Sequence, residues 1–252
     1  PPGRRARCVR AGAGRGGGGV GATMAGIIAH RGFNGLYPEN TRRAFEEALK
    51  LDIVGIECDV NLSKDGQVVV IHDLTVDRTS DGTGEVAQMT IDELRKLNVG
   101  TDDDPQQIML LDELLDLLDR YPGKHILIET KHPSPFGAAL EEAVAEVLRS
   151  RGMDADERVH LISFDPGAIE RFQRLLPDID TFLLVNGPFS PVGDCDAGPS
   201  VRQAKAQPEL LDGRFRTYVW TVNLPRDMVW LKENGASLIG TDLPHIALET
   251  LS

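Results

Sequence analysis

Residues 54–73, VGIECDVNLSKDGQVVVIHD, decide how this chain is interpreted. The Asp-Gly pair at 65–66 lies between two apolar runs, which is a strong short-range signal for a β-hairpin. A two-residue turn there pairs Asp59 with His72 on the opposite arm. Strand alternation places Glu57 on the same face as Asp59. The stretch therefore predicts two carboxylates and an imidazole that converge at the base of one hairpin.

Eight short apolar runs alternate with helix-like stretches once the return arm of this hairpin, Val68–His72, is set aside. Such alternation predicts a parallel sheet, and eight units in about 230 residues predict an α/β fold, the closed (β/α)8 or TIM barrel. We expect one domain over residues 24–252. The eight predicted strands are Ile27–His30, Val54–Asp59, His125–Thr130, Val159–Phe164, Thr181–Val185, Asp196–Ser200, Thr217–Val222 and Ser237–Thr241.

Amphipathic segments between these runs predict the outer helices. Asn40 or Thr41 is expected to cap the first helix, and Asn223 to cap a helix that begins at Pro225. The predicted helices cover Thr41–Leu51, Leu110–Leu118, Pro135–Arg151, Pro166–Leu176 and Pro225–Asn234.

Two regions depart from a regular barrel. Residues 73–108 are rich in turns and predict an insertion after the second strand, with one short helix at Ile91–Leu97. Only the residues Asn186–Asp194 join the fifth and sixth strands, whereas a parallel crossover normally needs a dozen or more. The segment Val201–Arg216 is also short, with one helix expected near Pro208–Leu211. We therefore expect an irregular barrel around strands five to seven.

Composition limits the possible partners. The chain has 27 basic and 39 acidic residues and a formal net charge of −12, with no basic cluster outside its first 23 residues. Binding to nucleic acid or to an anionic membrane is therefore not expected. The three cysteines, Cys8, Cys58 and Cys195, show no metal-ligand spacing and are typical of a reducing, cytoplasmic compartment. No apolar run is long enough to span a bilayer.

The first 23 residues are of low complexity, rich in glycine and arginine. They predict a disordered tail, with a functional basic arm as the alternative. They contain no apolar stretch of the kind found in a signal peptide. The glycine run precedes the first strand and lacks Gly-Lys-Ser/Thr, so it is not interpreted as a phosphate-binding loop.

The carboxyl ends of the predicted strands carry the polar residues, which is where barrel enzymes place their active groups. Glu57, Asp59 and Glu129 should surround one point, with Glu57 and Glu129 at the same height. Three unpaired carboxylates would repel one another and their pKa values would rise, unless a divalent cation were bound. Oxygen-only ligands favour Mg²⁺ or Ca²⁺.

Four further residues complete a set suited to phosphoryl transfer. His30 and His72 should flank the carboxylates, where one could act as a base and the other as an acid. Arg31 and Lys131 could hold phosphate oxygens and stabilise charge in the transition state. Together these residues fit metal-assisted phosphoryl transfer.

Each residue also has a purely structural interpretation. A strand-end histidine is more often hydrogen-bonded in place than catalytic, and Asn40 could cap a helix or contact a substrate. Trp220 could be a wall residue or a ligand contact, and Asp242 is expected in a turn before a helix. The remaining histidines are interpreted as structural or surface residues, namely His125, His132, His160 and His245. The shared rim position of seven complementary candidates favours the functional interpretation.

The ordered motifs resemble the glycerophosphodiester phosphodiesterase family over about Ile27 to Pro244. The motifs are His30-Arg31-Gly32, Pro38-Glu39-Asn40-Thr41, Glu57-x-Asp59-Val60, His72-Asp73, Asp77-Arg78-Thr79, Asp81-Gly82-Thr83-Gly84, Glu129-x-Lys131, Ser163-Phe164, Gly198-Pro199-Ser200, Trp220-Thr221-Val222-Asn223 and Thr241-Asp242. The resemblance implies a TIM barrel with a small insertion after a catalytic hairpin. It also implies hydrolysis of deacylated phospholipids, such as glycerophosphocholine, to sn-glycerol 3-phosphate and an alcohol.

The resemblance further implies a role for each candidate. Glu57, Asp59 and Glu129 would bind Mg²⁺ or Ca²⁺, and His30 and His72 would be acid and base. Arg31 and Lys131 would bind phosphate, and Trp220 would line the glycerol side. A cyclic phosphate intermediate and direct attack by water both remain open.

Two alternatives to this function are considered. One is a phospholipase of the same barrel type that acts on intact lipid, against which we find no exposed apolar loop at the rim and no basic membrane-facing patch. The other is a degenerate barrel that binds a phosphodiester without catalysis. That alternative predicts the loss of a histidine or a carboxylate, and none is missing.

Overall fold

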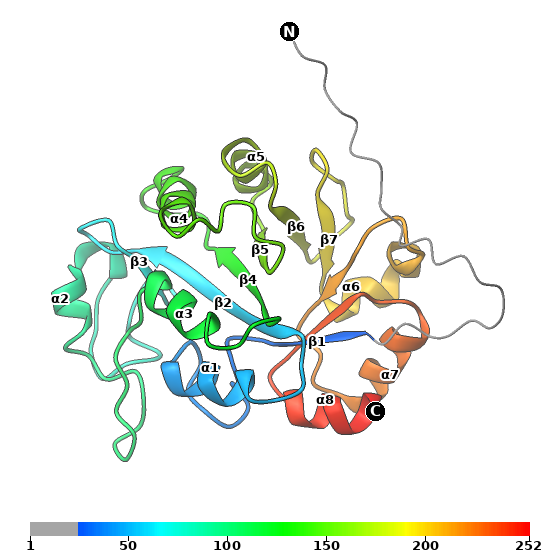
Figure 1. The fold of residues 1–252 in the computed structure, drawn as a ribbon, viewed down its shortest axis with the longest axis horizontal. Coiled ribbons are helices and arrows are strands. Elements are labelled where there is room, and N and C mark those ends of the chain that lie inside the picture. The colour runs from blue at the N-terminus through cyan, green and yellow to red at the C-terminus, as the bar shows by residue number, and fades with distance from the viewer. Residues whose placement is uncertain (1–24) are drawn as a thin grey trace, which may run out of the picture.

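The computed structural model describes residues 25–252, so the predicted tail at 1–23 lies outside the described residues. Eight parallel strands form a nearly closed barrel with helices around it (Figure 1), and the predicted TIM barrel is confirmed. The strands are β1 (Gly26–Ala29), β2 (Gly55–Leu62), β4 (His125–Thr130), β5 (Val159–Ser163), β6 (Asp180–Val185), β7 (Asp196–Pro199), β8 (Tyr218–Val219) and β9 (Leu238–Thr241).

The strands follow the order β7-β6-β5-β4-β2-β1-β9-β8 around the barrel. Between the two ends of this order, isolated bridges join Ala197 to Thr217 and Ser200 to Trp220. The segment Asn186–Asp194 contains no helix or strand, as its length predicts, and this side of the barrel is the irregular one.

The outer helices are α1 (Arg42–Leu49), α3 (Leu111–Leu118), α4 (Ala139–Ser150), α5 (Pro166–Leu175), α6 (Val201–Ala206), α7 (Pro225–Glu233) and α8 (Pro244–Leu251). Thr41 caps α1 by accepting a hydrogen bond from the backbone N–H of Ala44. The short helix α6 was not predicted, and Pro208–Leu211 forms a 3₁₀ turn. The expected Asn223 cap is wrong, because α7 has no side-chain cap.

Successive side chains of a strand point alternately outward and inward, so the apolar core has one part between the strands and the helices and another inside the barrel. Ile56, Cys58 and Val60 of β2 pack outward against the helices in the large core cluster, so the polar residues between them face inward. The lower barrel interior is filled by large apolar side chains, namely Ile28, Leu127, Ile162, Phe182, Leu184 and Tyr218. This packed interior leaves the polar residues at the carboxyl ends of the strands as the floor of a site.

The hairpin between β2 and β3 (Val68–Val70) is present, but its register differs from the prediction. Val60 pairs with Val70, and the backbone N–H of Ile71 donates to the carbonyl of Asp59 at 3.0 Å. The loop contains three residues rather than two, with Gly66 at a φ of +78°. The expected pairing of Asp59 with His72 is therefore wrong by one residue.

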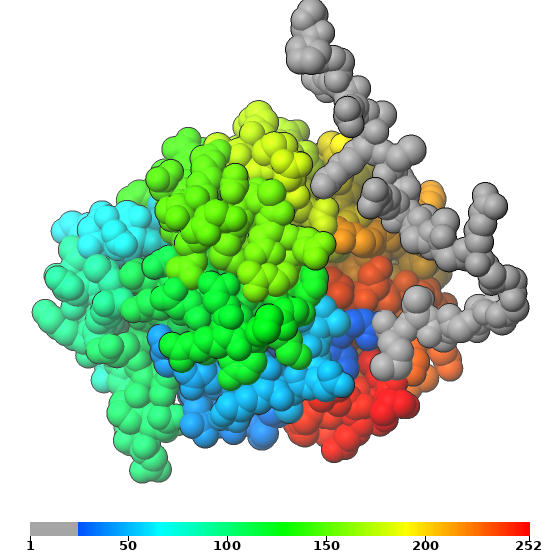
Figure 2. Space-filling view, viewed as in Figure 1, coloured from blue at the N-terminus to red at the C-terminus, as the bar shows by residue number. Residues whose placement is uncertain are grey.

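The segment between β3 and α3 builds a small core of its own at the left end of the molecule (Figures 1 and 2). It contains a 3₁₀ turn (Val86–Gln88) and the one-turn helix α2 (Ile91–Leu94). Its buried residues are Val69, Ile71, Val76, Val86, Leu94, Val99 and Ile108. No helix within residues 25–252 is both long and apolar enough to span a lipid bilayer.

Candidate active site

Three buried carboxylates meet at the mouth of the barrel. Glu57, Asp59 and Glu129 each offer an oxygen, and these oxygens all lie within 4.8 Å of one another. Asp59 of β2 is the register partner of Glu129 on β4, whereas Glu57 lies beside Leu127. The expectation that Glu57 and Glu129 share one height is therefore wrong. Glu57 lies two residues before Asp59 on β2, so it sits deeper in the barrel than Asp59 and Glu129.

Two cations partly neutralise this cluster. The Lys131 ammonium lies 2.6 Å from Glu129 Oε1 and 2.9 Å from Asp59 Oδ1, and Arg31 Nε lies 3.2 Å from Asp59 Oδ2. Burial would raise the pKa of Asp59, but Lys131 and Arg31 outweigh it and hold that pKa below its usual range. Burial and the Asp59 charge raise the pKa of Glu129 to about 7.

Glu57 is the least compensated member of the cluster. Burial, followed by the charges of Asp59 and Glu129, raises its pKa well above the usual range. Its Oε2 accepts the backbone N–H of Arg31 at 2.9 Å, but its Oε1 is buried and has no hydrogen-bond partner among residues 25–252. A buried, unpaired carboxylate oxygen beside two further carboxylates fits a hard divalent cation.

The loop between β1 and α1 holds two residues of the site in left-handed backbone conformations. Arg31 has a φ of +57° and Asn40 a φ of +56°. The Asn40 amide donates to Asp59 Oδ2 at 2.8 Å, so it orients a carboxylate, while the α1 cap falls to Thr41. Strained backbone of this kind is typical of functional sites.

His30 follows β1 and is anchored through one ring nitrogen. Its Nδ1 lies 2.8 Å from Asp242 Oδ1, and its Nε2 lies 4.0 Å from Glu57 Oε2. Asp242 also accepts hydrogen bonds from Asn34 at 3.2 Å and from Asn223 at 2.7 Å. Sequence reasoning missed this role of Asp242, for which its position directly after a strand was the available signal.

His72 is anchored in the same way on the other side of the site. Its Nδ1 lies 2.6 Å from Asp73 Oδ1, and Arg78 donates to Asp73 and to Glu39. Glu39 also accepts from Arg31 at 2.9 Å, so an ionic chain links the two sides. Burial lowers the pKa of His72. No local pattern predicts these pairings, because Glu39 and Arg78 are 39 residues apart.

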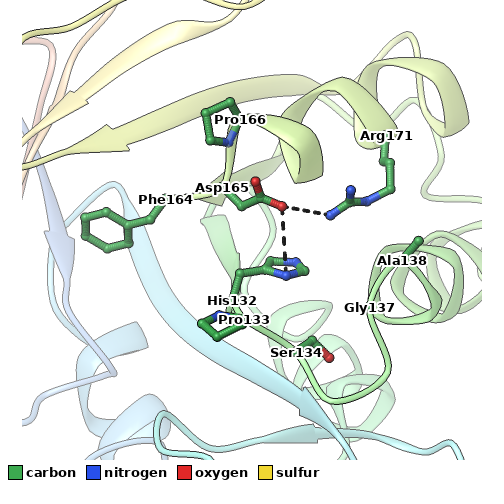
Figure 3. A pocket seen from close by; sticks show the side chains of 9 residues that line it. All are labelled: His132, Pro133, Ser134, Gly137, Ala138, Phe164, Asp165, Pro166 and Arg171. Carbon is green, nitrogen blue, oxygen red and sulfur yellow. Dashed lines mark hydrogen bonds and ion pairs between the residues drawn. The ribbon is translucent and has the colours of Figure 1, made fainter.

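Two adjoining cavities open at this rim. One, of about 490 Å³, is lined by His72, Leu74, Glu129, Lys131 and Phe164 among others. It shares His132, Pro133 and Phe164 with a second cavity of about 520 Å³ (Figure 3).

Phe164 and His132 line both cavities, and Trp220 packs against Phe164. Phe164 is also exposed, so the expectation of no exposed apolar loop at the rim is wrong. Trp220 donates its indole N–H to the Gly198 carbonyl at 2.8 Å, and its ring centroid lies 5.1 Å from that of Phe164. In the second cavity, His132 Nε2 lies 2.6 Å from the buried Glu141 carboxylate. His132 is therefore held structurally, as expected, although it lines both cavities.

Comparisons with known proteins agree with this geometry. The sequence profile described as the Glycerophosphoryl diester phosphodiesterase family matches residues 30–246. The chain is 35% identical over 245 residues to a Mycobacterium tuberculosis protein named "Probable glycerophosphodiester phosphodiesterase 1", covering 86% of this chain and 89% of that protein. It is 32% identical over 239 residues to the glycerophosphodiester phosphodiesterase of Caldanaerobacter subterraneus subsp. tengcongensis, covering 87% and 94%.

Solved structures agree in fold. A glycerophosphodiester phosphodiesterase from Agrobacterium tumefaciens superimposes with a TM-score of 0.77 at 26% identity, covering 90% of this chain and all of that chain. A phosphodiesterase from Oleispira antarctica, solved in complex with the product sn-glycerol-3-phosphate, has a TM-score of 0.80 at 25% identity, covering 90% and 96%.

Proposed function

This chain belongs to the glycerophosphoryl diester phosphodiesterase family, and on that premise we propose that it hydrolyses glycerophosphodiesters to sn-glycerol 3-phosphate and an alcohol with the help of a divalent cation. The observation that carries this proposal is the buried three-carboxylate cluster with an unpaired oxygen on Glu57. Two histidines, each anchored through Nδ1 to a carboxylate, lie at the same rim.

The proposed cation ligands are Glu57, Asp59 and Glu129, and oxygen ligation favours Mg²⁺ or Ca²⁺. When bound, such a cation would polarise the phosphate and neutralise part of its charge. The buried cluster supports this assignment, because Lys131 and Arg31 offer two positive charges against three carboxylates.

The proposed proton carriers are His30 and His72. A carboxylate that accepts Nδ1–H leaves Nε2 free to exchange a proton with the substrate, and each imidazole has such a carboxylate at Nδ1. Arg31 and Lys131 are proposed to bind the non-bridging phosphate oxygens. Trp220 is proposed to line the glycerol side.

We also propose a cytoplasmic location and a small-molecule substrate rather than nucleic acid. Cys58 and Cys195 are buried free thiols, which suits a reducing compartment. The acidic balance of the chain disfavours a polyanionic partner.

The test is the release of glycerol 3-phosphate from glycerophosphocholine and glycerophosphoethanolamine, with EDTA and with added Mg²⁺ or Ca²⁺. We expect turnover that EDTA abolishes and the cation restores. No turnover of either diester with cation present would contradict the proposed function. Turnover that resists EDTA would instead remove the assignment of the three carboxylates as cation ligands.

His72→Ala tests the proton-transfer assignment. We expect a loss in kcat of about 10²-fold or more, which is typical for removal of a general acid or base. His125→Ala is the matched control, because His125 begins β4 at the opposite end of the barrel. A His72→Ala enzyme as active as the His125→Ala control would make His72 structural.

A further inference from the structure

The insertion at residues 73–108 is joined to the active site through the side chain of Arg78. Its Nε lies 2.6 Å from Asp73 Oδ2, and its Nη2 lies 3.1 Å from Asp73 Oδ1. Nη1 and Nη2 each lie 2.8 Å from an oxygen of the Glu39 carboxylate. One guanidinium from the left end of the molecule (Figure 1) therefore bonds two carboxylates at once.

Each of these carboxylates also holds a side chain that the proposed reaction uses. Asp73 Oδ1 lies 2.6 Å from Nδ1 of His72, a proposed proton carrier. A carboxylate at Nδ1 orients an imidazole and selects the tautomer that leaves Nε2 for the substrate. Glu39 Oε1 lies 2.9 Å from Nη1 of Arg31, a proposed phosphate-binding group. Arg78 therefore bonds the partner of each of these two groups.

The four charged side chains form a balanced set. Arg31 and Arg78 carry two positive charges, and the two carboxylates carry two negative charges. The hydrogen bond from Arg78 is the largest influence on Asp73 and lowers its pKa to about 2. Burial would raise the pKa of Glu39, but its two guanidinium partners outweigh burial and lower that pKa. Without Arg78, the two carboxylates would share one guanidinium beside the site of an anionic phosphodiester.

The turn that carries Arg78 is fixed by its own contacts. Val76 is fully buried in the small core of the insertion, and its backbone N–H donates to the Gly84 carbonyl at 2.9 Å. The backbone N–H of Ser80 donates to the Val76 carbonyl at 3.0 Å, and Asp77 Oδ2 accepts the N–H of Gly84 at 3.0 Å. A turn closed in this way holds Arg78 at one place relative to the barrel.

We propose that Arg78 is a positioning residue, through which the insertion holds His72 and Arg31 in their reactive orientations. This inference rests on the proposed function. A planar guanidinium suits the task, because its fixed fork of donors bonds two carboxylates in a defined geometry. The structural alternative is that Arg78 only fastens the insertion to the barrel. That alternative predicts a loss of stability without a change in the kinetics of the folded enzyme.

Arg78→Gln is the first test, with glycerophosphocholine as the substrate and the cation present. We expect kcat to fall by about tenfold or more, because His72 loses its orientation. We expect KM to rise by about fivefold, because the excess negative charge repels the phosphate. Arg78→Lys keeps the charge without the fork and should recover KM but only part of kcat.

Arg95→Gln is the matched control for this test. Arg95 fastens the same insertion to α3 through an ion pair with Glu113 at 2.6 Å, so it shares the structural role without a link to His72 or Arg31. We expect its kcat and KM to stay at the wild-type values. Unchanged kinetics in both Arg78 variants, or equal losses in Arg95→Gln, would overturn the inference. A wild type that does not hydrolyse glycerophosphocholine would contradict the proposed function instead.

A double variant tests the route through His72. A residue that acts through His72 loses that part of its effect once His72 is absent. In the His72→Ala background, Arg78→Gln should therefore lower kcat by no more than about threefold, while KM still rises through Arg31. In the His125→Ala background, the full loss in kcat should persist. Equal losses in kcat in the two backgrounds would show that Arg78 does not position His72.

Discussion

Lys131 and Arg31 supply two positive charges to three buried carboxylates, so a fully ionised cluster would keep one excess negative charge among these five side chains. The chain relieves this partly by holding protons, since the pKa of Glu129 is raised to about 7 and that of Glu57 well above its usual range. A divalent cation must displace those protons before it can bind all three carboxylates.

Cation binding should therefore depend on pH. Glu129 is deprotonated above its pKa of about 7 and increasingly protonated below it, so affinity should fall as the pH falls through that value. One competing proton lowers affinity up to about tenfold per pH unit. Calorimetry with Mg²⁺ or Ca²⁺ in buffers of different ionisation enthalpy should detect release of at least one proton at pH 6. Equal affinity from pH 6 to 8 would contradict Glu129 as a ligand, and Glu129→Gln should weaken the dependence, with Glu57 supplying what remains.

Asp242 is expected to act through His30 as a positioning residue. Asp242→Asn keeps the shape but removes the charge that orients Nδ1, at 2.8 Å in the structure. We expect kcat to fall by about 10- to 100-fold with little change in KM. Losses of this size follow when a group that hydrogen-bonds the far ring nitrogen of a functional histidine is removed. Asp242→Glu should recover part of the loss. A fall confined to thermal stability, with kcat unchanged, would reduce Asp242 to a structural role.

At the scale of elements, the turn after β1 depends on close contact with α1. Gly32 has a φ of +77°, and an added Cβ would lie 2.7 Å from the backbone carbon of Ala44 in α1. No side chain fits between these two backbone segments. This close contact between Gly32 and α1 holds the loop that carries Arg31 and Asn40 into the site.

Gly32→Ala should therefore be strongly destabilising. The left-handed conformation alone costs an alanine about 1–2 kcal/mol, and the collision with backbone adds to it. Gly123→Ala is the control, because Gly123 has a φ of +87° but no atom within 4 Å of an added Cβ. Chemical denaturation should show a larger loss for Gly32→Ala than for Gly123→Ala. Equal losses would mean that α1 moves to accept the methyl group.

The hairpin shows how a local signal can be correct while its register is wrong. The Asp-Gly pair predicts a turn, but the three-residue loop with Gly66 shifts the whole return arm by one position. His72 still reaches the rim because strand pairing stops at Val70. There the Asn61 amide donates to the carbonyls of Ile71 and His72, at 2.9 and 3.3 Å. A side-chain contact across the hairpin therefore holds the backbone at Ile71 and His72 where strand pairing has ended.

At the scale of the molecule, acid stability is linked to the barrel end opposite the active site. His160 of β5 is buried, its Nε2 lies 3.0 Å from His125 Nδ1, and the two rings stack. Burial and the neighbouring His125 lower the pKa of His160 to about 4. The folded protein therefore prefers neutral His160, whereas the unfolded chain protonates near pH 6.5.

Stability should consequently fall between pH 6.5 and pH 4. The pKa of His160 is lower in the folded protein than in the unfolded chain. Its effect on the free energy of unfolding is therefore absent above pH 6.5 and reaches its full size below pH 4. That amount is about 3 kcal/mol. Urea denaturation of the wild type and of His160→Gln, compared at each pH, isolates this contribution from the carboxylates. Parallel curves for the two proteins would exclude it.

The eight-stranded barrel and the residues at its rim could both be predicted from the amino-acid sequence alone. Strand alternation and the strand–helix repeat depend on neighbours in the chain, so they can be read without long-range contacts. The same reasoning grouped Glu57, Asp59 and Glu129, because parallel strands end at one face of the barrel.

Which side chains contact one another could be learned only from the folded protein. The His30–Asp242 pair spans 212 residues, and the link from Arg78 to Glu39 crosses the insertion and the hairpin. The depth of Glu57 and the exposed apolar side chains at the rim likewise depend on strand register and on how loops pack. Register and barrel closure are set by contacts between distant segments, and no local pattern in the chain encodes them.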